Sequence, residues 1–405
     1  MSPVRTDVAI VGAGPAGLLL ARMLQLQGID TVVLERRSRQ HVLNRVRAGI
    51  IEQPVADLLI DLGVAGRMRA ERLLHDGVHL QFGGDAEARR VRIDFAALCG
   101  KAVTVYGQRE LVRDLIEQRE RDGLPLHFDA EVTGLDGLDG LDAEAVTLHC
   151  EATGPIEAAY AAGVDGAHGL TARIVPAERR GTLQRSYPGA WLGVLVQAPP
   201  PSDELIYSRH EAGFALASMR TPGISRLYLE VPATDRLADW SADRIWDQLH
   251  LRLDLPGSPV HEGPILESSI TPLRSIVHRR MRFGRLLVGG DAAHVVPPTG
   301  AKGMNLAVAD MAGLSAALVR ALRGGDPAGL DGYQGRCLER VWRATHFSWW
   351  MTDLLHRLDQ DDFEAALHAE QLRALGEGGR LAAWFADSYT GAPLPSWRPA
   401  AAVPR

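Results

Sequence analysis

TDVAIVGAGPAGLLLARMLQLQGIDTVVLE, residues 6–35, is the stretch that decides the fold of this chain. It begins with an apolar run, passes through the glycine-rich segment GAGPAG, continues at helical spacing, and ends in a second apolar run and an acid. This order predicts a strand, a tight turn, a helix and a second parallel strand. Such a βαβ unit is typical of the α/β class.

The spacing within GAGPAG predicts a dinucleotide-binding turn. Gly12 would allow the tight turn, Gly14 would let the backbone approach a pyrophosphate, and Gly17 would let the helix pack closely on the strand. Glu35 ends the second apolar run, where it would accept hydrogen bonds from a ribose. A purely structural glycine turn is the alternative, but the flanking strands, the helix and the acid together favour a dinucleotide.

Composition narrows the class of protein. The chain has 405 residues, 46% of them hydrophobic, enough for a large core in one elaborated α/β unit or in two or three domains. Its 44 basic and 50 acidic residues give a net charge of -6 without a long block of one sign, which argues against nucleic acid or a membrane surface as a partner. Cys99, Cys150 and Cys337 are isolated, so we expect neither disulfides nor a metal site.

We expect a cytoplasmic protein. The N-terminus lacks the features of a signal peptide, and no uncharged apolar run approaches the ~20 residues of a membrane span.

Pattern changes along the chain predict four segments. Residues 1–178 alternate helical and strand patterns and would form the first part of the dinucleotide-binding domain. Residues 179–275 hold short alternating runs such as WLGVLV, GFALASM and RLYLEV, which predict an inserted antiparallel sheet for the substrate. Residues 276–320 would return to the first domain, and residues 321–405 would form a helical C-terminal region.

A second loop, in GDAAHVVPPTGAKGMNLAVAD at residues 290–310, joins the apolar run GRLLVG to a helical pattern. Pro297 and Pro298 fix φ and lack amide donors, while Gly300 and Gly303 allow close approach, so the remaining amides can point at a bound group. The start of the following helix would stabilise an anion or a polar ring edge. Taken alone, the stretch could equally be an ordinary strand-to-helix turn.

A third motif, GVDGAHG at residues 163–169, again places a small-residue turn and an acid after a strand. Together the three motifs resemble those of the class A flavoprotein aromatic hydroxylases, and most closely the members that act on 4-hydroxybenzoate. The likeness covers nearly the whole chain and includes the strings RVRAGIIEQ, VTVYGQ, ELIY, PLRS, GDAAHVVPPTGAKGMNLA and FSWWM.

The resemblance implies a fold and a reaction. The fold would be mixed α/β: an FAD-binding Rossmann-like domain, an inserted antiparallel substrate sheet and C-terminal helices. The enzyme would use FAD, a reduced nicotinamide cofactor and dioxygen, through a flavin hydroperoxide, to hydroxylate 4-hydroxybenzoate beside its phenol and give 3,4-dihydroxybenzoate. Two alternatives stay open: the same chemistry on an aminobenzoate or another hydroxybenzoate, and a binding protein that keeps the flavin fold without redox chemistry.

The resemblance also assigns cofactor contacts. Asp291 would bind the ribityl chain, the loop at residues 297–303 would border the flavin ring, and the next helix would face the ring oxygen where reduced flavin carries negative charge. Taken alone, an arginine at such a position is more often a solvated charge or, for Arg226, half of a structural ion pair. The other matching positions are Gly12, Gly14, Gly17, Glu35, Arg45, Arg47, Gln108, Asp165, Arg226, Lys302, Gly303, Met304 and Asn305.

The segment YSRHEAGFALASMRTPGISRLYLE carries the predicted acid-binding site. Ser218 and Arg220 are one residue apart and so share a face of a strand, and Tyr228 on a neighbouring strand could join them. An arginine fork can bind both oxygens of a carboxylate, and the hydroxyls add donors. The residues alone leave a surface ion pair of Arg220 as an equal alternative, whereas the resemblance favours a clamp for the aromatic acid.

The resemblance places a proton relay at the phenol end of the substrate. Tyr207 and Tyr389 match two relaying tyrosines, His75 matches the histidine at the outer end, and the Pro298 carbonyl would face the substrate hydroxyl. Electrophilic attack needs a phenolate, and a phenol has a pKa near ~10 in water, so a buried chain must carry the proton to a titratable group. Taken alone, these would be a surface histidine and core aromatic residues.

Arg37, His168 and Arg274 match positions that bind the reduced nicotinamide cofactor. Arg37 also belongs to a basic cluster that would favour the 2′-phosphate of NADPH, although NADH is possible and a solvated turn is the alternative. The other members of that cluster are Arg36, Arg39 and His41.

The chain departs from the family after Asp165. The family has an arginine seven positions beyond that acid, where this chain has Ala172 and then Arg173. A bulge could restore the contact. FSWWM, residues 347–351, is interpreted as core or dimer packing, and we expect a homodimer.

Overall fold

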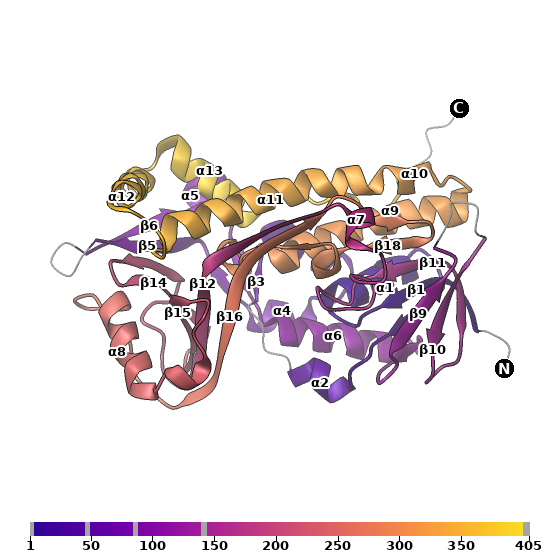
Figure 1. Ribbon diagram of the computed structural model, residues 1–405, viewed down its shortest axis with the longest axis horizontal. Helices are drawn as coiled ribbons and strands as arrows, with labels where there is room; N and C mark the ends of the chain where they lie inside the picture. Colours follow the sequence, from indigo (N-terminus) through magenta and orange to yellow (C-terminus); the bar gives the residue numbers. More distant parts are fainter. Residues whose placement is uncertain (1–3, 45–48, 84–87, 139–143, 400–405) are drawn as a thin grey trace.

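The computed structural model describes residues 4–44, 49–83, 88–138 and 144–399 and has two main sheets (Figure 1). The first contains β1 (Val4–Val11), which pairs in parallel with β2 (Thr31–Leu34) and with β11 (Ile156–Gly163). Between β1 and β2 the chain forms helix α1 (Pro15–Gln25). The predicted βαβ unit is therefore confirmed.

The first sheet continues on both sides of this unit, in the order β17-β18-β11-β1-β2-β8. Antiparallel strands β9 and β10 extend it beside β11. The added strands are β8 (Leu126–His127), β9 (Val132–Asp136), β10 (Val146–Cys150), β17 (Arg282–Phe283) and β18 (Leu286–Val288).

The second sheet has the order β19-β16-β12-β15-β14-β13-β5-β6. As predicted, its centre is antiparallel, and the side chains alternate between two faces because strands have a period of two. Its strands are β5 (Gly77–Phe82), β6 (Arg89–Asp94), β12 (Thr182–Val196), β13 (Ile206–His210), β14 (Gly213–Thr221), β15 (Ile224–Pro232), β16 (Ile265–His278) and β19 (His294–Val295).

Two strands of the second sheet come from residues 77–94, inside the segment assigned to the first domain. Strand β13 pairs in parallel with β5, and β5 pairs with β6. The open edge of β13 thereby gains a hydrogen-bonding partner. The second sheet is therefore not built from the inserted segment alone, and helix α8 (Ala242–Leu253) packs on it.

Long helices complete the fold from α9 onward, as the helical pattern predicted. Figure 1 shows α11 running along the molecule from the first sheet to the second. These helices are α9 (Gly303–Gly324), α10 (Ala328–Asp331), α11 (Tyr333–Leu355), α12 (Asp362–Gly376) and α13 (Gly379–Thr390).

Smaller elements connect the two sheets. A three-stranded sheet has the order β3-β7-β4. The connecting elements are α2 (Arg39–Asn44), β3 (Ile50–Ile51), α3 (Gln53–Asp61), α4 (Gly66–Glu71), β4 (Leu73–His75), α5 (Phe95–Cys99), β7 (Val103–Val105), α6 (Gln108–Arg121) and α7 (Ala177–Arg180).

Helix α9 is long and apolar enough by composition to cross a membrane, but 72% of its most apolar window is buried inside the protein. Its apolar residues contribute to the core around the first sheet. Packing within the protein therefore accounts for the composition of this helix.

Candidate functional site

The turn between β1 and α1 has the close contacts that its glycines predict. Gly12 has a φ of +113°, and a Cβ at Gly17 would lie 2.0 Å from the Gly12 carbonyl oxygen. At Gly14, by contrast, a Cβ would meet no atom of the described residues within 4 Å. The turn is therefore packed tightly on the protein side and open at Gly14, which fits a phosphate group approaching the start of α1.

Glu35, at the end of β2, supports this turn. One carboxylate oxygen accepts a hydrogen bond from the Ala13 amide at 2.9 Å, and the other accepts from the Arg37 amide at 2.9 Å. Each oxygen keeps a further lone pair for a ligand hydroxyl.

The Asp165 side chain forms hydrogen bonds within its own loop. Its carboxylate accepts hydrogen bonds from the Thr171 amide, at 3.1 Å, and from the Thr171 hydroxyl. A Cβ at Gly169 would lie 2.0 Å from this carboxyl group. Burial raises the pKa of Asp165, and the hydrogen bonds from Thr171 oppose that rise. A cofactor contact would share the carboxylate with Thr171, a partner that the sequence analysis missed.

The two residues at the position of the family arginine differ in exposure. Ala172 is buried, whereas Arg173 is exposed and donates its Nε to the Gly169 carbonyl at 3.1 Å. The Ala172 carbonyl accepts a hydrogen bond from Arg180, whose Nη1 lies 3.2 Å from Nε2 of His278.

The proline-rich loop is exposed at Pro298, whereas Pro297, Thr299 and Gly300 are buried. Pro298 is exposed, and its carbonyl accepts the Ala301 amide at 2.9 Å, which leaves a second lone pair. Ala301 has a φ of +53°. Helix α9 begins at Gly303, where a Cβ would meet no described atom within 4 Å. Asp291 lies half-buried in a short turn before this loop, and Met304 packs half-buried against the core of the first sheet.

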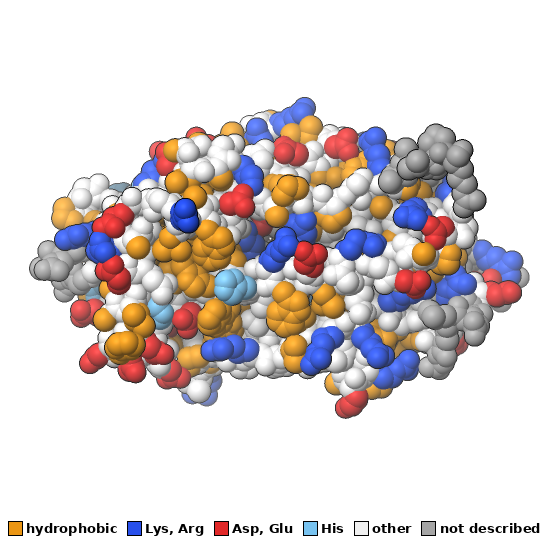
Figure 2. Space-filling model, turned by 90° about the horizontal axis from the view of Figure 1, so that it is seen from above, with side chains coloured by type: hydrophobic (Ala, Val, Ile, Leu, Met, Phe, Trp, Pro, Cys, Tyr) orange, Lys and Arg blue, Asp and Glu red, His pale blue; other side chains and the backbone are white. Residues whose placement is uncertain are grey.

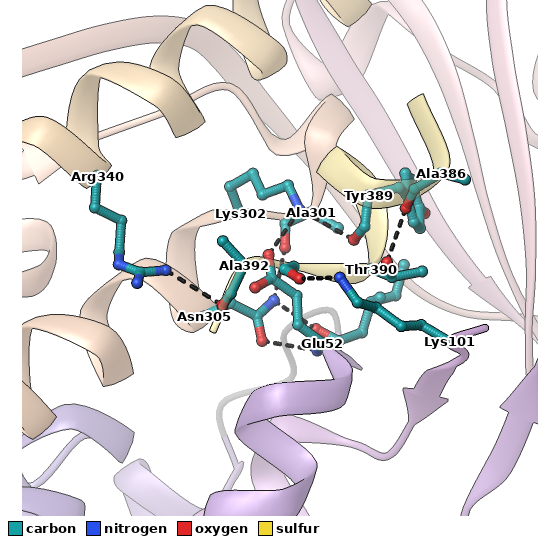
Figure 3. A network of polar contacts seen from close by, with 12 residues as sticks. Glu52, Lys101, Ala301, Lys302, Asn305, Arg340, Ala386, Tyr389, Thr390 and Ala392 are labelled. Carbon is teal, nitrogen blue, oxygen red and sulfur yellow. Dashed lines mark hydrogen bonds and ion pairs between the residues drawn. The ribbon is translucent and has the colours of Figure 1, made fainter. Parts of the chain in front are cut away.

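A buried ion pair joins the start of α9 to the start of α3 (Figure 3). Lys302 donates its Nζ to Glu52 at 2.6 Å and to the Tyr389 carbonyl at 3.0 Å. The Asn305 side chain accepts from the Glu52 amide and donates to the carbonyls of Ile50 and Ala301. Glu52 was missed by sequence reasoning, although it lies in the string RVRAGIIEQ, and it offsets the charge of Lys302.

The predicted relay residues lie deep in the protein. The hydroxyl oxygens of Tyr207 on β13 and Tyr389 on α13 are 2.8 Å apart, and each residue is 1% exposed. Burial raises the pKa of both phenols. His75 is also 1% exposed, and neither ring nitrogen has a hydrogen-bond partner within the described part of the chain. It pairs with Val103, which shares a hydrophobic cluster with both tyrosines.

The predicted acid clamp contains an arginine whose guanidinium is largely buried and has no acidic partner among the described residues. Ser218 and Arg220 lie on β14, with Tyr228 on the adjacent β15. Nε and Nη1 of Arg220 are buried and find no hydrogen-bond acceptor among the described residues. Burial lowers the pKa of Arg220, and the neighbouring Tyr228 opposes this. Burial of a guanidinium with two unsatisfied nitrogens and no acidic partner is costly, so an anionic ligand would stabilise this site.

Two further groups of predicted contact residues have partners within the protein. Arg226 forms an ion pair with Glu267, at 3.4 Å, and its guanidinium lies 5.4 Å from the Tyr228 ring centre, so the structural alternative for this arginine is present. Arg274 and His168 are brought together, with Nη2 and Nε2 3.2 Å apart.

The remaining predicted positions lie at the edge of the site. Arg37 is exposed after β2, and Gln108 begins α6. Arg39 pairs with Glu120 through two hydrogen bonds of 3.1 and 3.2 Å, so it is already neutralised. Arg45 and Arg47 lie outside the described residues.

Residues 5–348 match the model of the FAD binding domain family. The chain is 44% identical over 398 residues to the p-hydroxybenzoate hydroxylase of Acinetobacter baylyi, and the match covers 97% of each protein. It is 25% identical to a probable NADH-specific resorcinol 4-hydroxylase of Rhodococcus jostii, covering 81% of this chain and 61% of that protein.

A solved structure supports the fold. The p-nitrophenol 4-monooxygenase PnpA of Pseudomonas putida superposes with a TM-score of 0.78 at 18% identity, covering 96% of this chain and 99% of that one. Because the family model spans most of the chain and the Acinetobacter relative spans nearly all of it, the chain belongs to the family of FAD-dependent aromatic hydroxylases that includes p-hydroxybenzoate hydroxylase.

Proposed function

We propose that this enzyme hydroxylates 4-hydroxybenzoate beside its phenol to give 3,4-dihydroxybenzoate, with consumption of NADPH and dioxygen. The observation that carries the proposal is the guanidinium of Arg220, with two buried nitrogens that have no acceptor, in the same region as the buried hydroxyl pair of Tyr207 and Tyr389. One feature suits a carboxylate and the other a phenol. The 44% identity to a p-hydroxybenzoate hydroxylase supports the same substrate.

The open faces at Gly14 and Gly303 fit FAD, which would lie between the first turn and the proline-rich loop. When bound, FAD supplies the reduction and activation of dioxygen. Lys302 is neutralised by Glu52, so the start of α9 would supply the partial positive charge facing the ring. The residues proposed to hold FAD are Gly12, Gly14, Gly17, Glu35, Gln108, Asp165, Asp291, Lys302, Gly303, Met304 and Asn305, with Arg45, Arg47 and Arg226 from the family match.

The chain's own residues would orient the ring and remove its proton. Arg220 with Ser218 and Tyr228 would hold the carboxylate, while the Pro298 carbonyl would face the phenol. Tyr207 would accept the phenolic proton as it passes its own proton to Tyr389, because burial disfavours a lasting tyrosinate. Burial lowers the pKa of His75, which would receive the proton as a neutral base.

The test is hydroxylation by the purified, FAD-loaded protein. NADPH oxidation and product identity would be measured with 4-hydroxybenzoate, 3-hydroxybenzoate and 4-aminobenzoate. We expect 4-hydroxybenzoate to give 3,4-dihydroxybenzoate, with the highest catalytic efficiency of the three acids. If another acid gave more hydroxylated product per NADPH oxidised, that acid would replace 4-hydroxybenzoate as the proposed substrate. A colourless protein that takes up no FAD would favour the binding-protein alternative.

The basic segment after β2 supports a preference for NADPH over NADH. Arg36 and Arg37 remain exposed there, whereas Arg39 is paired with Glu120. His168 and Arg274 would bind the same cofactor. We expect Arg37→Ala to reduce the ratio of NADPH to NADH efficiency, and added salt to shrink it, because exposed charges are screened. Arg39→Ala is the matched control. An unchanged ratio in Arg37→Ala would exclude this segment from cofactor selection.

The outer face of α11 and α13 supports a homodimer. Figure 2 shows hydrophobic side chains gathered on the face seen from above, and Trp342 and Trp384 are 43% and 37% exposed. Aromatic residues are enriched at protein interfaces. Sedimentation of the purified enzyme would show twice the chain mass, and Trp342→Glu would shift it to a single chain. The isolated cysteines Cys99, Cys150 and Cys337 support the reducing cytoplasm as its location.

A further inference from the structure

At the C-terminal end of α11, hydrogen bonds link the second sheet to the proline-rich loop in a line that passes through both the carbonyl and the hydroxyl of Thr352. Trp191 on β12 donates its indole N–H to Nε2 of His356 at 2.7 Å. Nδ1 of His356 lies 2.8 Å from the Thr352 carbonyl oxygen. The hydroxyl oxygens of Thr352 and Thr299 are 2.9 Å apart. Four buried residues thus connect β12 to the loop that borders the proposed flavin site.

The chemistry of the partners determines each donor in this line. An indole N–H can only donate, so Nε2 of His356 accepts, and its proton must be on Nδ1, which donates to the Thr352 carbonyl. The Thr352 hydroxyl donates to the Ser348 carbonyl at 2.7 Å, so it accepts from Thr299. His356 is therefore neutral, and each donor in the line has one acceptor.

At one end, the line reaches the proposed acid clamp. The Trp191 ring packs against the ring of Tyr228, with 4.9 Å between ring centres. Tyr228 is further confined because a Cβ at Gly193 would lie 2.8 Å from its ring. The position of the Tyr228 hydroxyl beside Arg220 therefore depends on where the indole lies.

At the other end, the line reaches the loop of Pro298. Thr299 is fully buried, and a Cβ at the next residue, Gly300, would lie 2.7 Å from the Ser348 hydroxyl on α11. The loop therefore packs directly on the same two turns of α11 that carry Thr352. A small displacement of this part of α11 would move the loop.

Two buried charged residues attach the end of α11 to the second sheet. Arg209 on β13 donates to the carbonyls of Leu354 and His356, at 2.9 and 3.0 Å. Glu230 on β15 accepts the amides of Arg357 and Leu358 at 3.0 Å, and also that of Phe214 on β14, at 2.7 Å. The segment that follows α11 thus moves with the strands that carry Tyr207, Arg220 and Tyr228.

We infer that His356 and Thr352 are positioning residues that couple ligand binding at the acid clamp to the loop at residues 297–300. Binding of a carboxylate at Arg220 would fix Tyr228 and Trp191, and the hydrogen bonds through His356 and Thr352 would transmit that arrangement to Thr299. The inference rests on the proposed function, because it takes the clamp and the loop as the substrate and flavin sites.

The test compares the FAD-loaded wild-type enzyme with His356→Phe and Thr352→Val. Phenylalanine can keep the ring stack on Phe214, whose centre is 4.5 Å from that of His356, but it accepts nothing from Trp191. Thr345→Val is the matched control, because Thr345 lies on α11 and its buried hydroxyl has no partner among the described residues. His356→Gln, which can accept from the indole, serves as the conservative variant.

Two readouts report coupling rather than stability: the change in the absorption spectrum of bound FAD when the benzoate binds, and the ratio of NADPH oxidation rates with and without it. We expect both to fall about fivefold in His356→Phe and Thr352→Val, as for the loss of one buried hydrogen bond. FAD affinity and Thr345→Val should match the wild type, and His356→Gln should recover part of the effect. The double variant should be no worse than either single variant, since both break one line.

Lower melting temperatures with unchanged spectra and unchanged rate ratios would overturn the inference and leave His356 as a stability residue only. A wild-type enzyme that forms the product but shows no ligand effect on its flavin would overturn it too, with the proposed function intact. Conversely, if 4-hydroxybenzoate gives no product but another acid of the panel perturbs the flavin, and the variants abolish that perturbation, the proposed substrate fails and the coupling stands.

Discussion

At the scale of single residues, the guanidinium of Arg220, which has no acidic partner among the described residues, gives the clearest prediction. We expect Arg220→Met to weaken binding of 4-hydroxybenzoate by about 2–3 kcal/mol, because charge-assisted hydrogen bonds to the carboxylate are lost. Methionine keeps the apolar length of the side chain and removes the unpaired charge, so folding should not suffer. Titration of the flavin absorbance would measure the affinity of the wild type and of the variant for each ligand. Phenol, which lacks the carboxylate, is the control, and equal losses for both ligands would show that Arg220 is not the clamp.

The tyrosine pair gives the second prediction at this scale. Tyr207→Phe removes the hydroxyl that lies 2.8 Å from that of Tyr389 and should lower the hydroxylation rate by about 10²–10⁴, the usual scale of positioned proton transfer. FAD binding should be unchanged, while NADPH oxidation continues with release of hydrogen peroxide. Tyr160→Phe, a buried tyrosine in the first sheet, is the control. A normal yield of 3,4-dihydroxybenzoate from Tyr207→Phe would remove the relay from the mechanism.

At the scale of elements, two glycines of the turn between β1 and α1 should have different functions, Gly14 in binding FAD and Gly17 in stabilising the fold. Gly14 has a φ of −76°, and a Cβ there would meet no described atom within 4 Å, so the Gly14→Ala protein should fold normally. Its FAD affinity should fall about tenfold, because the added Cβ would face the phosphate. Gly17→Ala places a Cβ 2.0 Å from the Gly12 carbonyl and should cost about 1–3 kcal/mol of unfolding free energy.

Thermal unfolding of the FAD-free variants and fluorescence titration with FAD would measure these two effects separately. If Gly14→Ala bound FAD like the wild type, the pyrophosphate would not approach the turn at that position. If Gly17→Ala unfolded like the wild type, the close contact between α1 and the turn would not contribute to stability.

At the scale of the whole molecule, buried histidines should make the fold sensitive to acid. Burial, with Arg180 and His294 nearby, lowers the pKa of His278 to about 4. Between its unfolded pKa near ~6.5 and pH ~4 the unfolded chain binds the extra proton, so the free energy of unfolding falls as pH falls, by at most ~1.4 kcal/mol per pH unit for this group. The lowered pKa values of His75 and His356 act in the same direction. The pKa of His294, which Asp310 raises against the effect of burial, contributes stability that is lost only as the pH rises above ~6.5, so it does not change the slope below that pH.

Urea unfolding between pH 4 and 7.5 would measure this dependence. His278→Gln should give a shallower slope below pH 6.5, because glutamine can still accept from Arg180 but does not titrate. His261→Gln, at an exposed position, is the control. Parallel slopes for His278→Gln and the wild type would assign the acid sensitivity to other groups.

The sequence by itself determined the local parts of this protein. GAGPAG with its flanking apolar runs specified the β1–α1–β2 unit and the separate functions of Gly12 and Gly17, because turn geometry and side-chain periodicity depend on neighbouring residues. The alternating runs likewise predicted β12, β14 and β15, with Ser218 and Arg220 both on β14, where the pairing with β15 shifts register between Met219 and Thr221. The resemblance to a family then supplied the reaction.

Only the tertiary structure decided which distant residues meet. It joined β5 to β13, paired Lys302 with Glu52 across 250 positions, and left Arg220 buried without an acid. It also showed that Arg39 is held by Glu120 and that Arg173 donates to the Gly169 carbonyl. Contacts of this kind depend on how sheets and helices pack, and no spacing within one segment encodes them. The line from Trp191 through His356 to Thr299 exists for that reason: three separate segments converge at one end of α11.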